Sequence, residues 1–221
     1  NTSSGYWALG KNSTGSYNVA FGAWALFCNT TGYGQTAMGV CALRAATTGR
    51  SNVAVGYQAL TTVTTGVCNV AVGECALYYT TGNENTAVGT EAMRQNTSGT
   101  DNTAIGRMAL FANTTASYNT ATGHSALANN TTGSSNVADG NRALYTNTTG
   151  CHNTASGSEA LRFNTTASYN TAVGECALYA NTTGAINTGV GLWALKANTT
   201  GLLNTAIGGQ SMQTNTTGSY N

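Results

Sequence analysis

Proline is absent from this chain, and charged residues are scarce. None of the 221 residues is proline and only 7% are charged, whereas roughly 25% of residues are charged in typical soluble globular proteins. Because proline cannot donate a backbone hydrogen bond, its absence suits a regular backbone in which every N–H joins a ladder. The polar surface must therefore come from Asn, Thr, Ser and Gly.

Two further absences exclude classes of partner. The net charge is +1, from eight Lys and Arg against seven Asp and Glu, and the basic residues stand singly. Because nucleic acid requires a basic patch, we expect no nucleic-acid partner. No run of about 18 apolar residues occurs, so we expect no membrane span. The chain starts without Met or a signal peptide, and we interpret it as a segment of a longer array.

What the chain has instead is a repeat. With Asn1 as position one, a typical unit reads N-T-A-V-G-x-x-A-L-x-x-N-T-T-G-x-x and fills residues 1–221 as a single array. The step is 17 residues except once, where it is 16. A repeat this complete predicts a solenoid or fibre. The thirteen glycines at position five are Gly5, Gly22, Gly39, Gly56, Gly73, Gly89, Gly106, Gly123, Gly140, Gly157, Gly174, Gly191 and Gly208.

Positions one to four predict a short strand. Residues 52–55 and 102–105 alternate and include β-branched side chains, so the Ala of position three should face the core. Position four is apolar in most units but is Thr122, Asp139 and Ser156 in three successive ones. We therefore expect that face to be accessible and suited to contact with another chain.

Positions five, eight, nine and twelve have the spacing of one helical face, which predicts a helical or 3₁₀ turn. The N-T-T-G of positions twelve to fifteen predicts a loop, and the single deletion lies in it, between Tyr79 and Gly82. The predicted fold is thus a mainly β repeat solenoid of short parallel in-register strands. Thirteen such coils would give a rod of roughly 60 Å, built from one chain or from interleaved chains.

The units also resemble a known family. Asn69-Val70-Ala71-Val72-Gly73-Glu74-Cys75-Ala76-Leu77 and similar segments resemble the N-T-A-V-G-Y-Q-A-L-x-x-N-T-T-G repeats of phage tail-fibre-like and bacterial surface fibre proteins of the endosialidase-chaperone-containing type. More distantly, the strand motif is similar to that of trimeric autotransporter adhesin heads, which are β-rolls. The resemblance implies an extracellular stalk or fibre on a virion or cell surface, often homo-oligomeric and sometimes trimeric or adhesive. It supplies no catalytic residues.

Asparagines in N-x-S/T sequons are the candidate modification sites. Asn1 and Asn129 match the motif, and the others recur at position twelve. The competing interpretation is that N-T-T is simply repeated turn chemistry. The position-twelve candidates are Asn12, Asn29, Asn96, Asn113, Asn130, Asn147, Asn164, Asn181, Asn198 and Asn215.

Other columns carry weaker hypotheses. Thr or Ser fills positions thirteen and fourteen of every full-length unit, as an ice-binding face requires. The competing interpretation is a hydrated turn, because these residues lie in the predicted loop and not on a flat strand. His124 and His152 fall in different columns without a nucleophile beside them, so we expect no active site, no metal site and no cofactor. Free thiols or bridges between neighbouring chains are expected for the six cysteines, Cys28, Cys41, Cys68, Cys75, Cys151 and Cys176.

These patterns favour a non-catalytic structural segment of an extracellular fibre that associates with copies of itself. The alternative is an adhesive module that binds a surface receptor or glycan through exposed aromatics, and an ice-binding solenoid is a lesser one. The aromatics singled out for binding are Trp7, Trp24, Trp193, Tyr17, Tyr118 and Tyr169.

Overall fold

The computed structural model describes all 221 residues and divides into two compact units, Asn1–Thr115 and Ala116–Asn221. Each unit is a parallel β-solenoid built of 17-residue coils, except that coil 69–84 of the N-terminal unit has 16 residues. The strands of the N-terminal unit are β1 (Thr2–Ser4), β2 (Val19–Phe21), β3 (Thr36–Met38), β4 (Val53–Val55), β5 (Val70–Val72), β6 (Thr86–Val88) and β7 (Thr103–Ile105). Those of the C-terminal unit are β8 (Thr120–Thr122), β9 (Val137–Asp139), β10 (Thr154–Ser156), β11 (Thr171–Val173), β12 (Thr188–Val190) and β13 (Thr205–Ile207).

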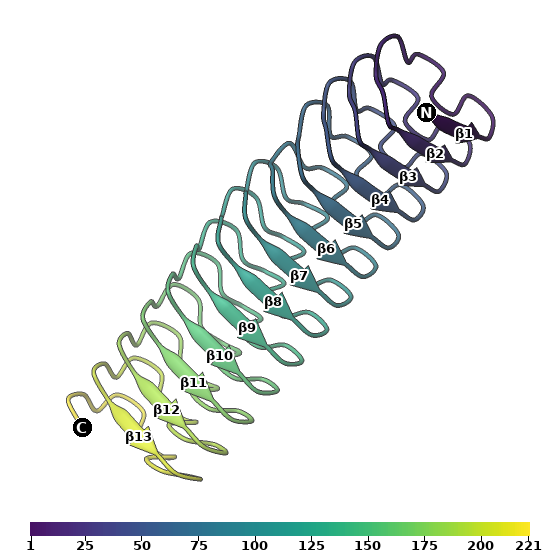
Figure 1. Ribbon diagram of the computed structural model, residues 1–221. Coiled ribbons are helices and arrows are strands. Elements are labelled where there is room, and N and C mark those ends of the chain that lie inside the picture. Colours follow the sequence, from purple (N-terminus) through teal and green to yellow (C-terminus); the bar gives the residue numbers. More distant parts are fainter. The chain divides into compact units, whose positions relative to one another are not determined.

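Within each unit, each strand pairs in parallel and in register with the strand of the next coil, as the repeat predicts. Figure 1 shows β1 to β7 side by side, each followed by its own loop. Val53 of β4 lies opposite Val70 of β5, and Val70 lies opposite Thr86 of β6 although one residue fewer separates them. The deletion leaves the strand register unchanged because the missing residue belongs to the loop.

The core is a column of small and branched side chains. Ala54 of position three, Ala59 of position eight and Leu60 of position nine are all fully buried, which confirms that position three faces inward. Position four faces outward: Met38 is 44% and Ile105 is 46% exposed. The predicted accessibility of this face is therefore confirmed.

The predicted helical turn after each strand is wrong, because no residue of the chain is helical. In residues 39–46, the N–H of Ala42 donates to Gly39 and that of Ala46 to Leu43, within one coil. The intervening N–H groups of Cys41, Leu43 and Ala45 donate to neighbouring coils instead. This segment therefore pairs with both neighbours, which a helix cannot do because its N–H groups bond within the helix.

Left-handed backbone at positions seven and nine produces this alternation. Cys41 has φ 60° and Leu43 has φ 51°. The residues at positions seven and nine of all the other coils have similar values. A left-handed residue other than glycine costs roughly 1–2 kcal/mol. Burying a leucine contributes about 1.5–3 kcal/mol, and Leu43 is fully buried. The buried leucine thus offsets the strain of its own backbone.

The glycine of position five is required by close packing and by its backbone. Gly56 has φ +133°, and a Cβ placed on it would lie 2.6 Å from the carbonyl oxygen of Gly73 in the next coil. Position fifteen differs, since its glycines lack positive φ. This agrees with the occurrence of Ala116 and Ala167 there.

Candidate functional site

Buried asparagine ladders line the interior of both units. At position twelve, Asn164 donates both Nδ2 hydrogens, to Oδ1 of Asn147 at 2.8 Å and to the carbonyl of Ala167 at 3.0 Å. At position one, Asn153 donates in the same way to Oδ1 of Asn136 and to the carbonyl of Ala167. Each ladder therefore ties a coil to the preceding coil and also closes its own loop.

These ladders place most of the position-twelve sequon asparagines inside the coil. A glycan would replace an Nδ2 hydrogen that the ladder uses, so the folded coil has no room for it at fully buried positions. Asn12 and Asn215 are half-buried, and only Asn1 and Asn129 of the sequon asparagines are exposed. The fully buried members are Asn29, Asn96, Asn113, Asn130, Asn147, Asn164, Asn181 and Asn198.

The threonine column considered for ice binding is also engaged in holding coils together. The hydroxyl of Thr148 donates to the carbonyl of Thr165 at 3.1 Å, and that of Thr182 donates to the carbonyl of Thr199 at 3.1 Å. Most hydroxyl protons of position thirteen therefore bond to the next coil and are not free donors.

All six cysteines are free thiols, and only Cys68 is exposed. Sγ of Cys75 lies 3.7 Å from Oε1 of Gln58. Burial raises the pKa of Cys75 above its ordinary value, and burial likewise raises the pKa of Cys176. A raised pKa lowers the thiolate fraction at neutral pH, so these two thiols are poor nucleophiles.

Aromatic and basic side chains gather on the turn segment of the N-terminal unit. Trp7 and Trp24 stack with ring centroids 6.1 Å apart, and the guanidinium of Arg44 lies 5.5 Å from the Trp24 ring. The Lys11 ammonium lies 4.9 Å from the ring of Phe27. We call this set the N-terminal strip; its members are Trp7, Lys11, Trp24, Phe27, Arg44, Tyr78 and Arg94.

The C-terminal unit carries a corresponding strip. The Lys196 ammonium lies 4.4 Å from the Trp193 ring and 5.9 Å from that of Tyr179. Arg162 faces the rings of Phe163 and Tyr179 and pairs with Glu159 at 2.8 Å. The members of this C-terminal strip are Arg142, Tyr145, Glu159, Arg162, Phe163, Tyr179, Trp193 and Lys196.

A shallow depression of about 290 Å³ interrupts the N-terminal strip. It forms because the small side chains of Ala45, Thr61 and Thr62 lie between the larger ones of Arg44 and Tyr78, which belong to coils two steps apart. An open depression walled by a cation and a phenol is suited to a polar ring. The lining residues are Cys28, Arg44, Ala45, Thr61, Thr62 and Tyr78.

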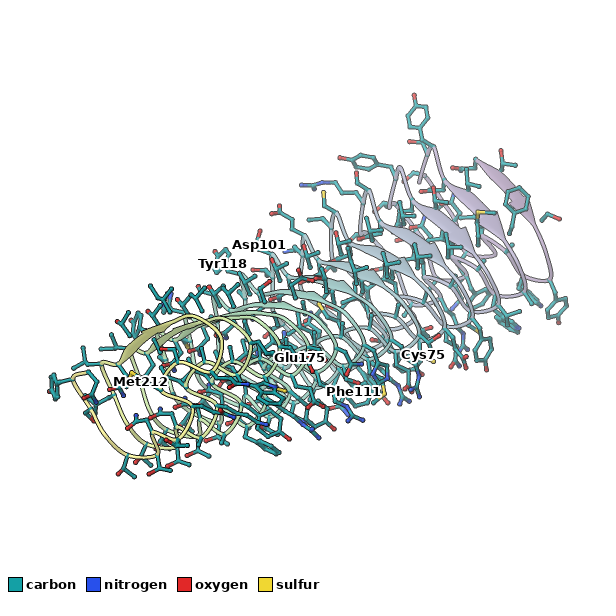
Figure 2. The ribbon with its side chains drawn as sticks, turned by 90° about the horizontal axis from the view of Figure 1, so that it is seen from below. Cys75, Asp101, Phe111, Tyr118, Glu175 and Met212 are labelled. Atoms are coloured by element: carbon teal, nitrogen blue, oxygen red, sulfur yellow. The ribbon has the colours of Figure 1, made fainter.

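The structure brings together only some of the aromatics predicted for binding. Trp7 and Trp24 belong to the N-terminal strip and Trp193 to the C-terminal strip, whereas Tyr17, Tyr118 and Tyr169 occupy position seventeen. In the N-terminal unit, Figure 2 places Cys75 and Phe111 on a different side from Asp101, which is also at position seventeen.

The basic partners of these rings were not predicted from the sequence. The sequence did contain a signal, because Phe27, Arg44, Tyr78 and Arg94 all occupy position ten. Stacking of the coils places residues of the same position within a few strand spacings of one another.

No group of three or more His, Cys, Asp or Glu side chains has a metal-binding arrangement. None of the elements is a helix long and apolar enough to span a bilayer. In comparisons with known proteins, no protein-family model, curated protein or solved structure matches the chain.

Proposed function

We propose that this chain is a non-catalytic structural segment of an extracellular fibre. The observation that supports it is the bonding of each coil to its neighbours along its whole circumference. In residues 136–152, the N–H groups of Val137, Leu144 and Thr148 donate to the following coil, and that of Arg142 donates to the preceding coil. A coil held on strand, turn and loop resists bending and peeling, as a mechanical spacer requires.

Self-association completes this proposal. The outward face of the N-terminal strands is apolar, with Phe21 at 40% and Met38 at 44% exposure. Exposed apolar side chains in neighbouring coils form a surface that a second copy could cover. We propose a homo-oligomer, with a trimer as one form, that joins through this face.

Sedimentation velocity over a range of concentrations tests the association, and electron microscopy tests the fibre. Concentration-dependent oligomers and filaments are expected. Met38→Asp should shift the chain to monomer, whereas Tyr17→Asp, which changes an 83% exposed residue elsewhere, should not. A wild-type chain that stays monomeric and forms no filaments at any concentration would contradict the proposal.

The two strips favour a second candidate, an adhesive module that binds a surface glycan or receptor. Trp7 is 49% exposed although it stacks on Trp24, so one ring face or edge is available to a sugar. Glycan-array binding tests this directly. Trp7→Ala with Trp24→Ala should abolish binding, whereas Tyr118→Ala should leave it intact, and equal loss in both variants would exclude the strip as the site.

A further inference from the structure

In each loop, several donors converge on one carbonyl of the next coil. The N–H groups of Ser13, Thr14 and Gly15 all donate to the carbonyl of Thr30, at 3.0 to 3.1 Å, and the Ser13 hydroxyl joins them at 2.8 Å. The acceptor is always the carbonyl of position thirteen. The same arrangement recurs in later coils, for instance from Thr131, Thr132 and Gly133 to Thr148.

In the short coil, residues 69–84, the carbonyl of position thirteen accepts none of these bonds from the coil before it. Thr81 occupies position thirteen, because its N–H and its hydroxyl both donate to the carbonyl of Thr97. The residue missing between Tyr79 and Gly82 is therefore that of position fourteen. Accordingly, the N–H groups of Thr64, Thr65 and Gly66 and the Thr64 hydroxyl have no hydrogen-bond acceptor in the protein. Other loops leave one or two of the corresponding N–H groups open, as at Thr166 and Ala167, but each keeps the bonds of its position-thirteen residue. Among the loops before the last, all four donors are open together only in this one.

The neighbouring bonds keep these donors in position. The carbonyl of Thr64 accepts hydrogen bonds from the N–H groups of Thr47 and Thr48, and that of Gly66 accepts one from Nδ2 of Asn52 at 2.7 Å. On the other side, the loop of the short coil is held through the Gly82 carbonyl, which accepts from Nδ2 of Asn69 at 2.9 Å. Thr64 and Thr65 are exposed, so solutes can reach the donors.

We propose that Thr64, Thr65 and Gly66 form a binding site for one oxygen of a small tetrahedral oxyanion, phosphate or sulfate. Successive backbone N–H groups that point to one place bind anions, and hydrogen bonds to a charged acceptor are about twice as strong as neutral ones. Arg50, in the loop of the preceding coil, is exposed and adds a positive charge near the site. The negative charge of Glu84, in the following coil, partly opposes this attraction for an anion. This site goes beyond the proposed structural function and does not depend on it.

Amide chemical shifts of the full chain, titrated with sodium sulfate or phosphate at constant ionic strength, test the site. The Thr64, Thr65 and Gly66 amides should shift saturably, with a dissociation constant of about 1 mM, and the closed donors of Ser13 to Gly15 should not. Sodium chloride is the control for non-specific salt effects. The amides of the last loop, 216–218, are not part of the test because residues 1–221 include no coil beyond them.

The decisive variant carries one additional Thr between Thr80 and Thr81, which restores a 17-residue coil. The carbonyl of position thirteen should then accept from the preceding loop, as it does in the full-length coils. This insertion should reduce the affinity by at least about tenfold because the protein's own acceptor then occupies the site. Thr64→Val, which removes only the hydroxyl, should weaken binding severalfold and keeps the test valid if the insertion disturbs folding. Binding that survives both changes, or an unshifted wild-type chain, would overturn the proposal.

A last comparison separates two sources of the anion. Glucosamine 6-sulfate binding at the same amides, with unmodified glucosamine inactive, would identify a sulfate ester of a glycan as a ligand. Binding of inorganic sulfate alone would identify the free anion, and either result supports the oxyanion site.

Discussion

Among single residues, the glycine of position five has the least freedom to change. Gly140 has φ +131°, and an added Cβ would lie 2.6 Å from the Gly157 carbonyl oxygen. Both the backbone and the contact oppose a side chain, so Gly140→Ala should lower the free energy of unfolding by about 3 kcal/mol or more. Urea denaturation followed by circular dichroism measures the change.

Gly209→Ala is the matched control, because Gly209 lacks positive φ and a Cβ added to it would come no closer to a neighbour than 4.0 Å, at the Leu192 carbonyl oxygen. Its effect should be within about 0.5 kcal/mol. Equal destabilisation by the two substitutions would show that the coils do not approach each other closely at Gly140.

The cysteines give a prediction about reactivity. Burial raises the pKa of Cys75 and of Cys176, whereas Cys68 is exposed. At pH 8, iodoacetamide should therefore alkylate Cys68 severalfold faster, which peptide mass spectrometry can follow. Because the folded pKa of the two half-buried thiols is raised, their contribution to stability is present below the pKa of the unfolded thiol. It should be lost as pH rises through the folded pKa. Alkylation of Cys75 or Cys176 before Cys68 would contradict this assignment.

Among the structural elements, the position-twelve ladder of the C-terminal unit is a buried polar part of the core. Asn164→Ala would remove the Nδ2 group that donates to Asn147 and Ala167. It would also remove Oδ1 of Asn164, which accepts a hydrogen bond from Nδ2 of Asn181 at 3.0 Å. Leaving buried groups unpaired should cost about 2–4 kcal/mol in the free energy of unfolding. Asn129→Ala, at an exposed sequon, should cost less than about 1 kcal/mol. If both substitutions had the same small effect in urea denaturation, the ladder would not stabilise the fold.

Part of this element structure was predictable from the sequence. Alternation at positions one to four predicted the strands and the burial of Ala54 correctly. Successive side chains of a strand point to opposite faces, so the pattern shows directly which residues face the core. The turn was predicted wrongly because the spacing of Gly39, Ala42 and Leu43 is shared by a helix and by a turn with left-handed residues at Cys41 and Leu43. Sequence spacing reports which residues are buried and carries no information on the sign of φ.

The candidate sites show the same limit. The N-x-T pattern is compatible with an exposed loop or with a buried ladder, and only the stacking of coils places Asn164 inside. The open donors of Thr64 to Gly66 were also hidden, although the deletion in the loop of residues 69–84 was evident in the sequence. Which bonds the deletion breaks becomes clear only when the hydrogen bonds between coils are known.

For the molecule as a whole, the repeat implies that a complete coil is a removable unit. Deleting residues 136–152 from the C-terminal unit would join Ser135 to Asn153, which occupies position one just as Asn136 does. Ala121 would then stack on Ala155, and the ladders would continue. Because stability in a solenoid is approximately a sum over coils and their interfaces, the shortened chain should stay folded with a moderately lower free energy of unfolding.

Deleting only residues 136–143 is the matched disruption, since it would place Leu144 where the buried asparagine of position one belongs and leave a coil too short to close. Far-UV circular dichroism, amide spectra and urea denaturation should show a folded, cooperative C-terminal unit for the first deletion and its loss for the second. The comparison tests whether the coil is the unit of folding. The first deletion removes more residues than the second, yet it should destabilise the unit less. Comparable disruption by both would mean that contacts beyond neighbouring coils hold the unit together, and the structural role proposed for the repeat would then lose its physical basis.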